Sequence, residues 1–237
     1  LAHNFPHVPL FASKEFAGTS RRGLYGDVVE EIDWSVGQIL ETLRAEGLDN
    51  NTMVVFTSDN GPWLSFDAHG GSAGLLRDGK GSTWEGGMRE PTIFWWPGKI
   101  APSLVREMGS TLDLLPTIAA ITGASAPSDR ILDGDDLAPT LFHNLPSPRE
   151  SMFYYHGQEV FAVRHGMFKA HFKTKTSYTG QRDPEVHDPP LLFHLGHDPS
   201  EKYNIAQEHP DVIDALRQLK TEHEASIVHV ENQLDKK

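Results

Sequence analysis

The amino-acid sequence predicts an α/β fold followed by a smaller unit of antiparallel strands and a terminal helix. In the first part, an amphipathic helical pattern over residues 25–46 leads directly into the apolar run Met53–Phe56, and this helix-to-strand step is typical of α/β layers. In the second part, three short strand-like runs between residues 152 and 172 are separated by turn residues, as in an antiparallel meander. We therefore expect two units, residues 1–140 and residues 141–237.

The helix over residues 25–46 is indicated by its periodicity. Apolar side chains recur at spacings of three and four residues, and acidic residues and glutamine occupy the opposite face. The apolar set is Val28, Val29, Ile32, Val36, Ile39, Leu40 and Leu43. Gly47 is well placed to end this helix, because glycine readily takes the left-handed conformation that follows many helices.

Two apolar runs, Met53–Phe56 and Thr92–Trp96, are predicted to be buried strands. The second run is closed by Pro97-Gly98, a pair that favours turns. Residues 61–90, between the two runs, are rich in glycine and are interpreted as a loop.

Further elements follow the second run. Asp113 is expected to cap a helix that runs to Ile121 and ends at Gly123, and a Pro/Asp-rich linker spans residues 125–150. Strands are then expected at Met152–Tyr155, Val160–Arg164 and Phe168–Phe172, with Leu191–Leu195 as a candidate fourth. The amphipathic segment that begins at Pro210 is predicted to be the terminal helix.

Composition and charge exclude several classes of function. The formal net charge of −12 argues against nucleic-acid binding, since phosphate backbones bind basic surfaces. No apolar stretch approaches the roughly 20 residues that a membrane-spanning helix needs. The chain has no cysteine, so it holds no disulfide, thiolate metal site or cysteine nucleophile. Residues 1–4 carry neither a methionine nor a leader pattern, and we expect a fragment or a processed chain.

The segment Asp59-Asn60-Gly61, directly after the first apolar run, is the candidate metal site. Carboxylate and amide oxygens are ligands that Ca²⁺ and Mg²⁺ prefer, and open α/β sheets bind ligands beyond the carboxyl ends of their strands. Two ligands are too few for Ca²⁺, which takes about 6–8 oxygens, so others must come from elsewhere. The alternative is an Asx turn, because Asp-Asn-Gly is also favourable turn chemistry.

Lys80 lies between two glycines in the predicted loop. A lysine in such a place can contact a bound anion or donate a proton, and the alternative is an ordinary solvated loop lysine. Glu85 and Arg89 follow in the same loop, and we interpret them as an internal ion pair that shapes it. The alternative places Arg89 at the substrate.

His7 lies between Pro6 and Pro9, which we expect to keep the segment stiff and extended. An imidazole held in this way is suited to donating a proton to a leaving group near neutral pH. The alternative is a hydrogen-bonded surface histidine, and His3 competes for the same role. The histidines and aspartates of residues 187–198 match no compact zinc signature, and we interpret them as structural.

Three segments resemble, in this order, the C-terminal half of type I sulfatases, in the alkaline phosphatase superfamily and near the branch of arylsulfatase A and N-acetylgalactosamine-6-sulfatase. They are AHNFPHVPLFAS at 2–13, VVFTSDNGP at 54–62 and GLLRDGKGSTWEGGMREP at 74–91. Supporting segments lie at 25–40, 109–124, 132–141 and 191–206. The resemblance spans nearly the whole chain, and its Asp-Asn and lysine segments are specific in combination.

The resemblance implies a large mixed sheet sandwiched between helices, followed by a small antiparallel sheet with a terminal helix. It implies that Asp59 and Asn60 bind a metal ion, usually Ca²⁺ with Mg²⁺ as the alternative, and that Lys80 contacts the sulfate. His7 matches the histidine that contacts the sulfate and assists the leaving group. The implied substrate is a sulfate ester of a small molecule or a glycan. The implied location is periplasmic, secreted or lysosomal.

The family also has parts that this chain lacks. Its nucleophile is a formylglycine, made from Cys or Ser in a Cys/Ser-x-Pro-Ser-Arg motif of the N-terminal half. No such motif occurs here, and the segment 146–149 resembles it only superficially, because it lacks the nucleophile. We therefore expect a sulfuric ester hydrolase whose partner is the missing N-terminal half, with little turnover by these residues alone. The alternatives are a phosphate or phosphonate ester hydrolase of the same superfamily and a non-catalytic remnant that binds sulfated glycans.

Overall fold

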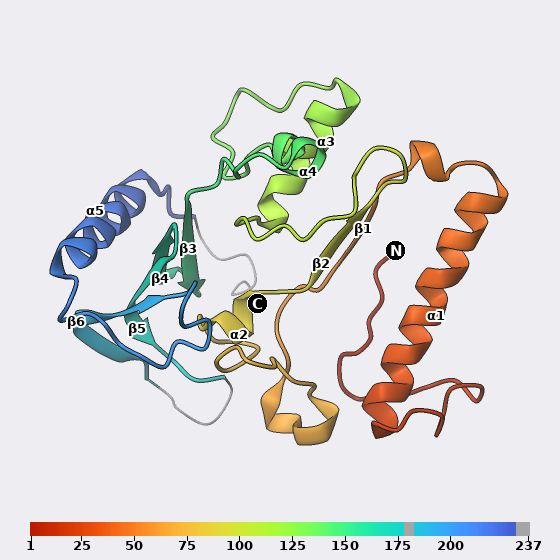
Figure 1. Ribbon diagram of the computed structural model, residues 1–237. Helices are drawn as coiled ribbons and strands as arrows, with labels where there is room; N and C mark the ends of the chain where they lie inside the picture. The colour runs from red at the N-terminus through yellow and green to blue at the C-terminus, as the bar shows by residue number, and fades with distance from the viewer. Residues whose placement is uncertain (178–182, 231–237) are drawn as a thin grey trace. The chain divides into compact units, whose positions relative to one another are not determined.

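The computed structural model describes residues 1–177 and 183–230 of the chain (Figure 1). Helices and strands are mixed in the first part, and a small antiparallel sheet with a terminal helix follows. The expected α/β class and the order of its parts are therefore confirmed. None of the described helices combines the length and the apolar composition that crossing a bilayer requires.

The chain divides into two compact units. The first joins Leu1–Ala73 to Met88–Glu150, and the second joins Gly74–Gly87 to the residues from Ser151 onward. This division differs from the expected boundary after residue 140. The segment 74–87 belongs with the C-terminal residues because Glu85 binds Lys169 with its side chain and Glu201 with its backbone amide.

The first unit contains one long helix, a two-stranded sheet and several short helices. In chain order these are α1 Gly23–Ala45, η1 Asp49–Asn51, β1 Val54–Thr57, η2 Leu64–His69, β2 Thr92–Trp95, η3 Thr111–Asp113, α3 Leu114–Thr122 and α4 Ala138–His143. Gly47 ends α1 as expected: its φ is 65°, and the amide of Leu48 donates to the carbonyl of Leu43 at 2.8 Å. Helix α4 lies in the predicted linker, and its six residues are too few to show a periodic pattern.

Strands β1 and β2 pair antiparallel, with Phe56 opposite Ile93. The expectation that both strands are buried is wrong: Phe56 is 39% exposed and Ile93 is 59% exposed. Among the described residues this sheet consists of two strands, and a sheet of that size can bury little of its own surface. Because residues directly opposite each other point to the same side, this sheet presents an apolar pair on one face.

Asp113 stabilises the turn before α3 and does not cap that helix as expected. Its carboxylate accepts the amides of Ser110 at 2.7 Å and of Asp135 at 2.8 Å. The hydroxyl of Ser110 in turn accepts the amide of Leu112 at 3.2 Å, so Ser110 is the capping residue. Arg149 donates through Nε to both oxygens of Asp113, at 3.0 and 3.1 Å. The arginine of the superficially motif-like segment is therefore the structural partner of a fully buried carboxylate.

The second unit is built on a four-stranded antiparallel sheet in the order β3-β4-β5-β6. The strands are β3 Ser151–His156, β4 Glu159–His165, β5 Phe168–Thr174 and β6 Glu185–His194, and the terminal helix is α5 Pro210–Ser226. All four expected strands and the terminal helix are present. Strand β6 begins earlier than expected, at Glu185 instead of Leu191.

The two faces of this sheet are covered by different parts of the chain. Helix α5 covers one face, over a core formed by Val160, Val163, Ala170, Leu192, Ala206, Ile213 and Leu216 (Figure 1). Lys169 and His171 point to the opposite face, because successive side chains of a strand alternate. The segment 74–87 covers that face, where Trp84 lies against His171 with ring centroids 4.1 Å apart.

Candidate functional site

The bend after β1 holds the candidate metal ligands. Within it, the hydroxyl of Ser58 donates to the carbonyl of Asn60 at 3.1 Å. Asp59 is exposed and Asn60 is half-buried. Among the described residues, neither side chain has a hydrogen-bond partner, so the Asx turn, which needs a backbone amide bound to Asp59, is not formed. The oxygens of both side chains are therefore available as ligands.

These oxygens fit a hard divalent cation by their chemistry. Ca²⁺ takes about 6–8 oxygen ligands, far more than two side chains supply. Across residues 1–177 and 183–230, no three His, Cys, Asp or Glu side chains form a group that could hold a metal ion. Asp59 and Asn60 thus offer part of a coordination shell.

Glu90 is a neighbour of this pair that the sequence pattern did not single out. Its pKa is raised to about 7, first by burial and then by the negative charge of Asp59. Its Oε1 atom is buried without a hydrogen-bond partner among the described residues. The pairing of the strands gives the reason: Thr57 lies opposite Thr92 at the end of the ladder, so Asp59, just after β1, and Glu90, just before β2, lie at the same end of the sheet. Acidic groups placed in this way attract a cation.

His7 lies in a turn and bends, so the expectation of an extended segment is wrong; prolines are equally suited to turns. Its Nδ1 is 2.7 Å from the carbonyl oxygen of Val8. A carbonyl only accepts, so Nδ1 carries the proton and Nε2 is the atom that can exchange a proton with a ligand. The exposed ring lies beside Trp63, with centroids 5.5 Å apart, close to the segment that follows Asn60.

The loop that carries Lys80 is folded back on itself. The amide of Gly86 donates to the carbonyl of Arg77 at 2.8 Å, so the two ends of the loop touch. A Cβ at Gly86 would lie only 2.2 Å from the carbonyl oxygen of Asp78, and only glycine allows this approach. Lys80 lies between the touching ends.

Ser177, in the loop after β5, holds the backbone of Lys80. Its hydroxyl donates to the carbonyl of Lys80 in a short hydrogen bond, and its amide nitrogen lies 3.2 Å from Oδ2 of Asp78. Ser177 itself is 1% exposed. The main chain of Lys80 is therefore fixed by a buried residue from a distant part of the sequence.

The predicted site residues fall into both units. His7, Asp59 and Asn60 belong to the first unit, and Lys80 belongs to the second. Glu85 pairs with Lys169 at 2.8 Å, a partner that the sequence did not indicate, and the expected pair of Glu85 with Arg89 stays a prediction.

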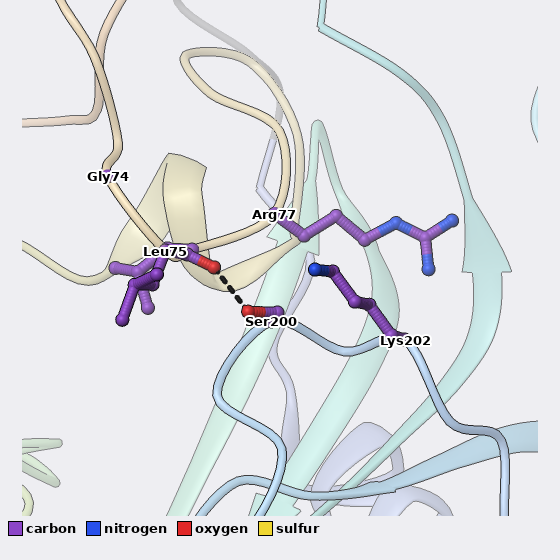
Figure 2. A pocket seen from close by; sticks show the side chains of 6 residues that line it. Gly74, Leu75, Arg77, Ser200 and Lys202 are labelled. Atoms are coloured by element: carbon purple, nitrogen blue, oxygen red, sulfur yellow. Dashed lines mark hydrogen bonds between the residues drawn. The ribbon is translucent and has the colours of Figure 1, made fainter.

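A cavity of about 350 Å³ lies at the base of the Lys80 loop (Figure 2). It is lined by Gly74, Leu75, Leu76, Arg77, Ser200 and Lys202. The hydroxyl of Ser200 donates to the carbonyl of Leu75, as the dashed line in Figure 2 marks. Arg77 donates to the carbonyl of Glu201 at 2.7 Å. The turn of residues 200–202 thus holds the beginning of the loop and adds a second cationic side chain, Lys202, to the cavity wall.

The residues of 187–198 make structural contacts, in line with their interpretation. His187 lies 2.8 Å from the hydroxyl of Thr174 through Nε2, and Arg217 donates to Asp188 at 2.6 Å. The carboxylate of Asp198 accepts two backbone amides of the turn that follows it.

Comparison with known proteins gives matches over nearly the whole chain. The family model described as Sulfatase matches residues 1–124, and the one described as the C-terminal region of aryl-sulfatase matches residues 147–237. Arylsulfatase A of Homo sapiens is 44% identical over 92% of this chain and 46% of that protein. N-acetylgalactosamine-6-sulfatase of Mus musculus is 42% identical over 97% of this chain and 48% of that protein.

Solved structures agree with these matches. The crystal structure of Ps i-CgsB in complex with k-i-k-neocarrahexaose has a TM-score of 0.75 and 30% identity to this chain, covering 92% of this chain and 48% of that one. The chain spans about half the length of the curated relatives it matches.

Proposed function

The chain belongs to the sulfatase family, and we propose that it forms the C-terminal half of an enzyme that hydrolyses sulfuric esters. The structural observation that supports this proposal is the bend after β1, where Asp59 and Asn60 keep their oxygens available. A pair of this kind at the end of a strand is suited to hold a cation beside a negatively charged ester. The match to about half of each relative supports the N-terminal half of the same protein as the partner.

We propose Ca²⁺, with Mg²⁺ as the alternative, as the cation that Asp59 and Asn60 help to hold. When bound, the cation supplies positive charge that stabilises the sulfuryl oxygens as negative charge develops on them. Glu90 lies close enough to Asp59 for the charge of Asp59 to raise its pKa.

Lys80 and His7 have separate roles in this proposal. Lys80 places a compact positive charge against a sulfate oxygen, and its fixed backbone means that little reorganisation is needed when the charge develops. His7 acts in its imidazolium form, in which both ring nitrogens carry a proton: Nε2 donates its proton to the departing alcohol oxygen, while Nδ1–H stays bound to the carbonyl of Val8. The nucleophile, a formylglycine in this family, is assigned to the N-terminal half, where it supplies the group that attacks sulfur.

We propose a sulfated glycan as the substrate class, with a small sulfated molecule as the alternative. One relative carries an amino sugar in its name, and Ps i-CgsB was solved with a neocarrahexaose bound. Comparing hydrolysis of a sulfated oligosaccharide with that of an aryl sulfate distinguishes the two. A location outside the cytosol, which the family resemblance implies, stays a prediction.

The test uses the full open reading frame that contains this chain. Its product should hydrolyse an aryl sulfate faster than the matching aryl phosphate, while the 237 residues alone should show little or no turnover. A preference for the phosphate ester would favour the phosphohydrolase alternative. Robust turnover by the 237 residues alone would contradict the assignment of the nucleophile. Saturable glycan binding without turnover by the complete protein would indicate a non-catalytic role.

A further inference from the structure

We propose that Ser177 and Glu201 position Lys80 by fixing the backbone of its loop. The inference rests on the sulfatase function proposed above, in which Lys80 contacts the sulfate. Both residues act through the main chain of the loop, so they are positioning residues. All of the contacts that support the proposal lie within the second unit.

Glu201 holds the loop at its C-terminal end. Its Oε2 accepts the amide of Glu85 at 2.6 Å, at the first residue of the short helix α2 (Glu85–Met88). Its Oε1 lies 2.7 Å from Nε2 of His171 and 3.2 Å from Nζ of Lys169. The side chain of Glu201 is 0% exposed, and so are those of its partners Lys169 and His171. The orientation of the Glu201 carboxylate is therefore set by its hydrogen bonds to these partners and to the amide of Glu85.

The charges around Glu201 are balanced inside the protein. Lys169 lies between two carboxylates, because its Nζ also donates to Oε1 of Glu85 at 2.8 Å. Arg164 is 4.0 Å from the other oxygen of Glu85. Burial lowers the pKa of His171 to about 4, so at neutral pH this residue is uncharged and donates Nε2–H to Glu201.

A charged network is a costly way to cover a sheet face. Replacing buried ion pairs with apolar side chains of similar volume is often neutral or stabilising, so the network is weak evidence for stability. What it supplies here is a fixed orientation, because one of its hydrogen bonds ends on a defined backbone atom of the loop, the amide of Glu85. Glu201 binds the amide of Glu85 with its side chain, and its own carbonyl accepts from Arg77.

Ser177 holds the loop at Lys80 itself, through the hydrogen bond to its carbonyl. The two anchors therefore bracket the segment 80–85, and Ser82 closes it by donating to the carbonyl of Gly79 at 2.9 Å. A misplacement of about 1 Å in a catalytic group can cost roughly 100-fold in rate. Loosening either anchor should therefore lower the rate even when the protein stays folded.

The first test is Ser177→Ala in the complete protein, which removes the hydroxyl and keeps the amide bound to Asp78. We expect kcat for an aryl sulfate to fall by roughly 10- to 100-fold, with a smaller change in KM. The matched control is Ser226→Ala, which loses a similar 2.7 Å bond from a serine hydroxyl to the carbonyl of His223 at the end of α5. Ser177→Thr, which keeps a hydroxyl, should recover part of the rate. Equal rates for Ser177→Ala and the wild type would overturn the proposal.

A double-mutant cycle separates positioning from a general structural effect. If Ser177 acts through Lys80, adding Ser177→Ala to Lys80→Ala should slow the enzyme no further. If the double variant instead lost the product of the two single fold-decreases in rate, the proposal would be contradicted. Glu201→Gln should lower kcat as Ser177→Ala does, and should also have no further effect in the Lys80→Ala background. If Glu201→Gln does not fold, the results for Ser177→Ala are sufficient to test the proposal.

Amide hydrogen exchange gives a readout that does not depend on activity. In the complete protein, Ser177→Ala should speed exchange at residues 79–87, and Ser226→Ala should not. Unchanged exchange in this segment would refute the positioning role. A Lys80→Ala variant with wild-type kcat would instead refute the role of Lys80 in the proposed function, so the two failures are distinguishable.

Discussion

Lys169 Nζ lies 2.8 Å from Oε1 of Glu85, although the two residues are 84 positions apart in the sequence. Neither side chain is more than 1% exposed. The pair joins the beginning of strand β5 to the start of helix α2, so it ties the Lys80 loop to the C-terminal sheet. Removing one partner of such a pair leaves an uncompensated charge in the interior.

Lys169→Met should therefore destabilise the protein by about 3–5 kcal/mol, the usual cost of breaking a buried ion pair. The free energy of urea unfolding measures this loss. Lys173→Met is the matched control on the same strand: Lys173 pairs with Glu159 at 2.7 Å, but the two side chains are 33% and 61% exposed. Such surface pairs contribute at most about 1 kcal/mol. Similar small losses for both variants would show that the buried pair is not needed for stability.

His171 should make the fold sensitive to acid. Its pKa is lowered from 6.5 to about 4, first by burial, so the neutral imidazole stabilises the folded state above pH 6.5. That contribution is lost as the pH falls from 6.5 towards 4, because the unfolded chain binds a proton earlier than the folded one.

The free energy of unfolding measured between pH 7.5 and pH 4.5 checks this expectation. In His171→Gln, the free energy of unfolding should decrease less steeply as the pH falls, even though this variant is less stable than the wild type at pH 7.5. His229→Gln, which changes an exposed histidine, should leave the decrease as it is in the wild type. Identical slopes for the wild type and His171→Gln would contradict the assigned titration.

His7 should matter most for esters whose alcohol is a poor leaving group. General acid catalysis contributes about 10²–10⁴-fold, and an activated phenol needs little of it. In the complete protein, His7→Gln should thus slow hydrolysis of a sulfated sugar far more than that of p-nitrophenyl sulfate. His3→Gln is the control, because His3 is the competing histidine of the same segment. A greater loss of rate in His3→Gln than in His7→Gln would indicate that His3, and not His7, assists the leaving group.

Cation binding at Asp59 should be visible without any assay of turnover. A ligand at 100 times its Kd stabilises a protein by about 2.7 kcal/mol, so added Ca²⁺ should raise the melting temperature of the chelator-treated complete protein. Asp59→Asn, which removes the charge but keeps the shape, should shift this response to higher Ca²⁺ concentrations. Asp33→Asn, on the exposed surface of α1, serves as the control and should respond like the wild type. An unchanged response in Asp59→Asn would exclude Asp59 as a ligand.

The elements with a local signal could be predicted from the sequence. Helix α1, its end at Gly47 and the strands of the C-terminal sheet follow from periodicity and turn residues within short windows. The candidate ligands Asp59 and Asn60 and the loop of Lys80 were also found locally, because glycine and polar residues directly follow or interrupt apolar runs.

The contacts that hold the loop could not be predicted in this way. In β5, Lys169 and His171 alternate with Phe168 and Ala170, and this pattern predicts one apolar face and one solvated face. The polar face is buried only because the segment 74–87 covers it. The residues near β5 in the sequence give no indication that a distant segment packs there. Glu90 was missed for a related reason, since its neighbour Asp59 becomes visible only when the register of β1 and β2 is known.

The assignment of residues 74–87 to the second unit has a consequence for the order of events during synthesis. A chain grows from its N-terminus, so this segment emerges well before Ser177 and Glu201 exist. Until they are made, the glycine-rich loop has neither of its anchors, and Lys80 is not yet held. A chain whose synthesis stopped before Ser177 would therefore contain Asp59 and Asn60 but neither of the residues that anchor the backbone of the Lys80 loop.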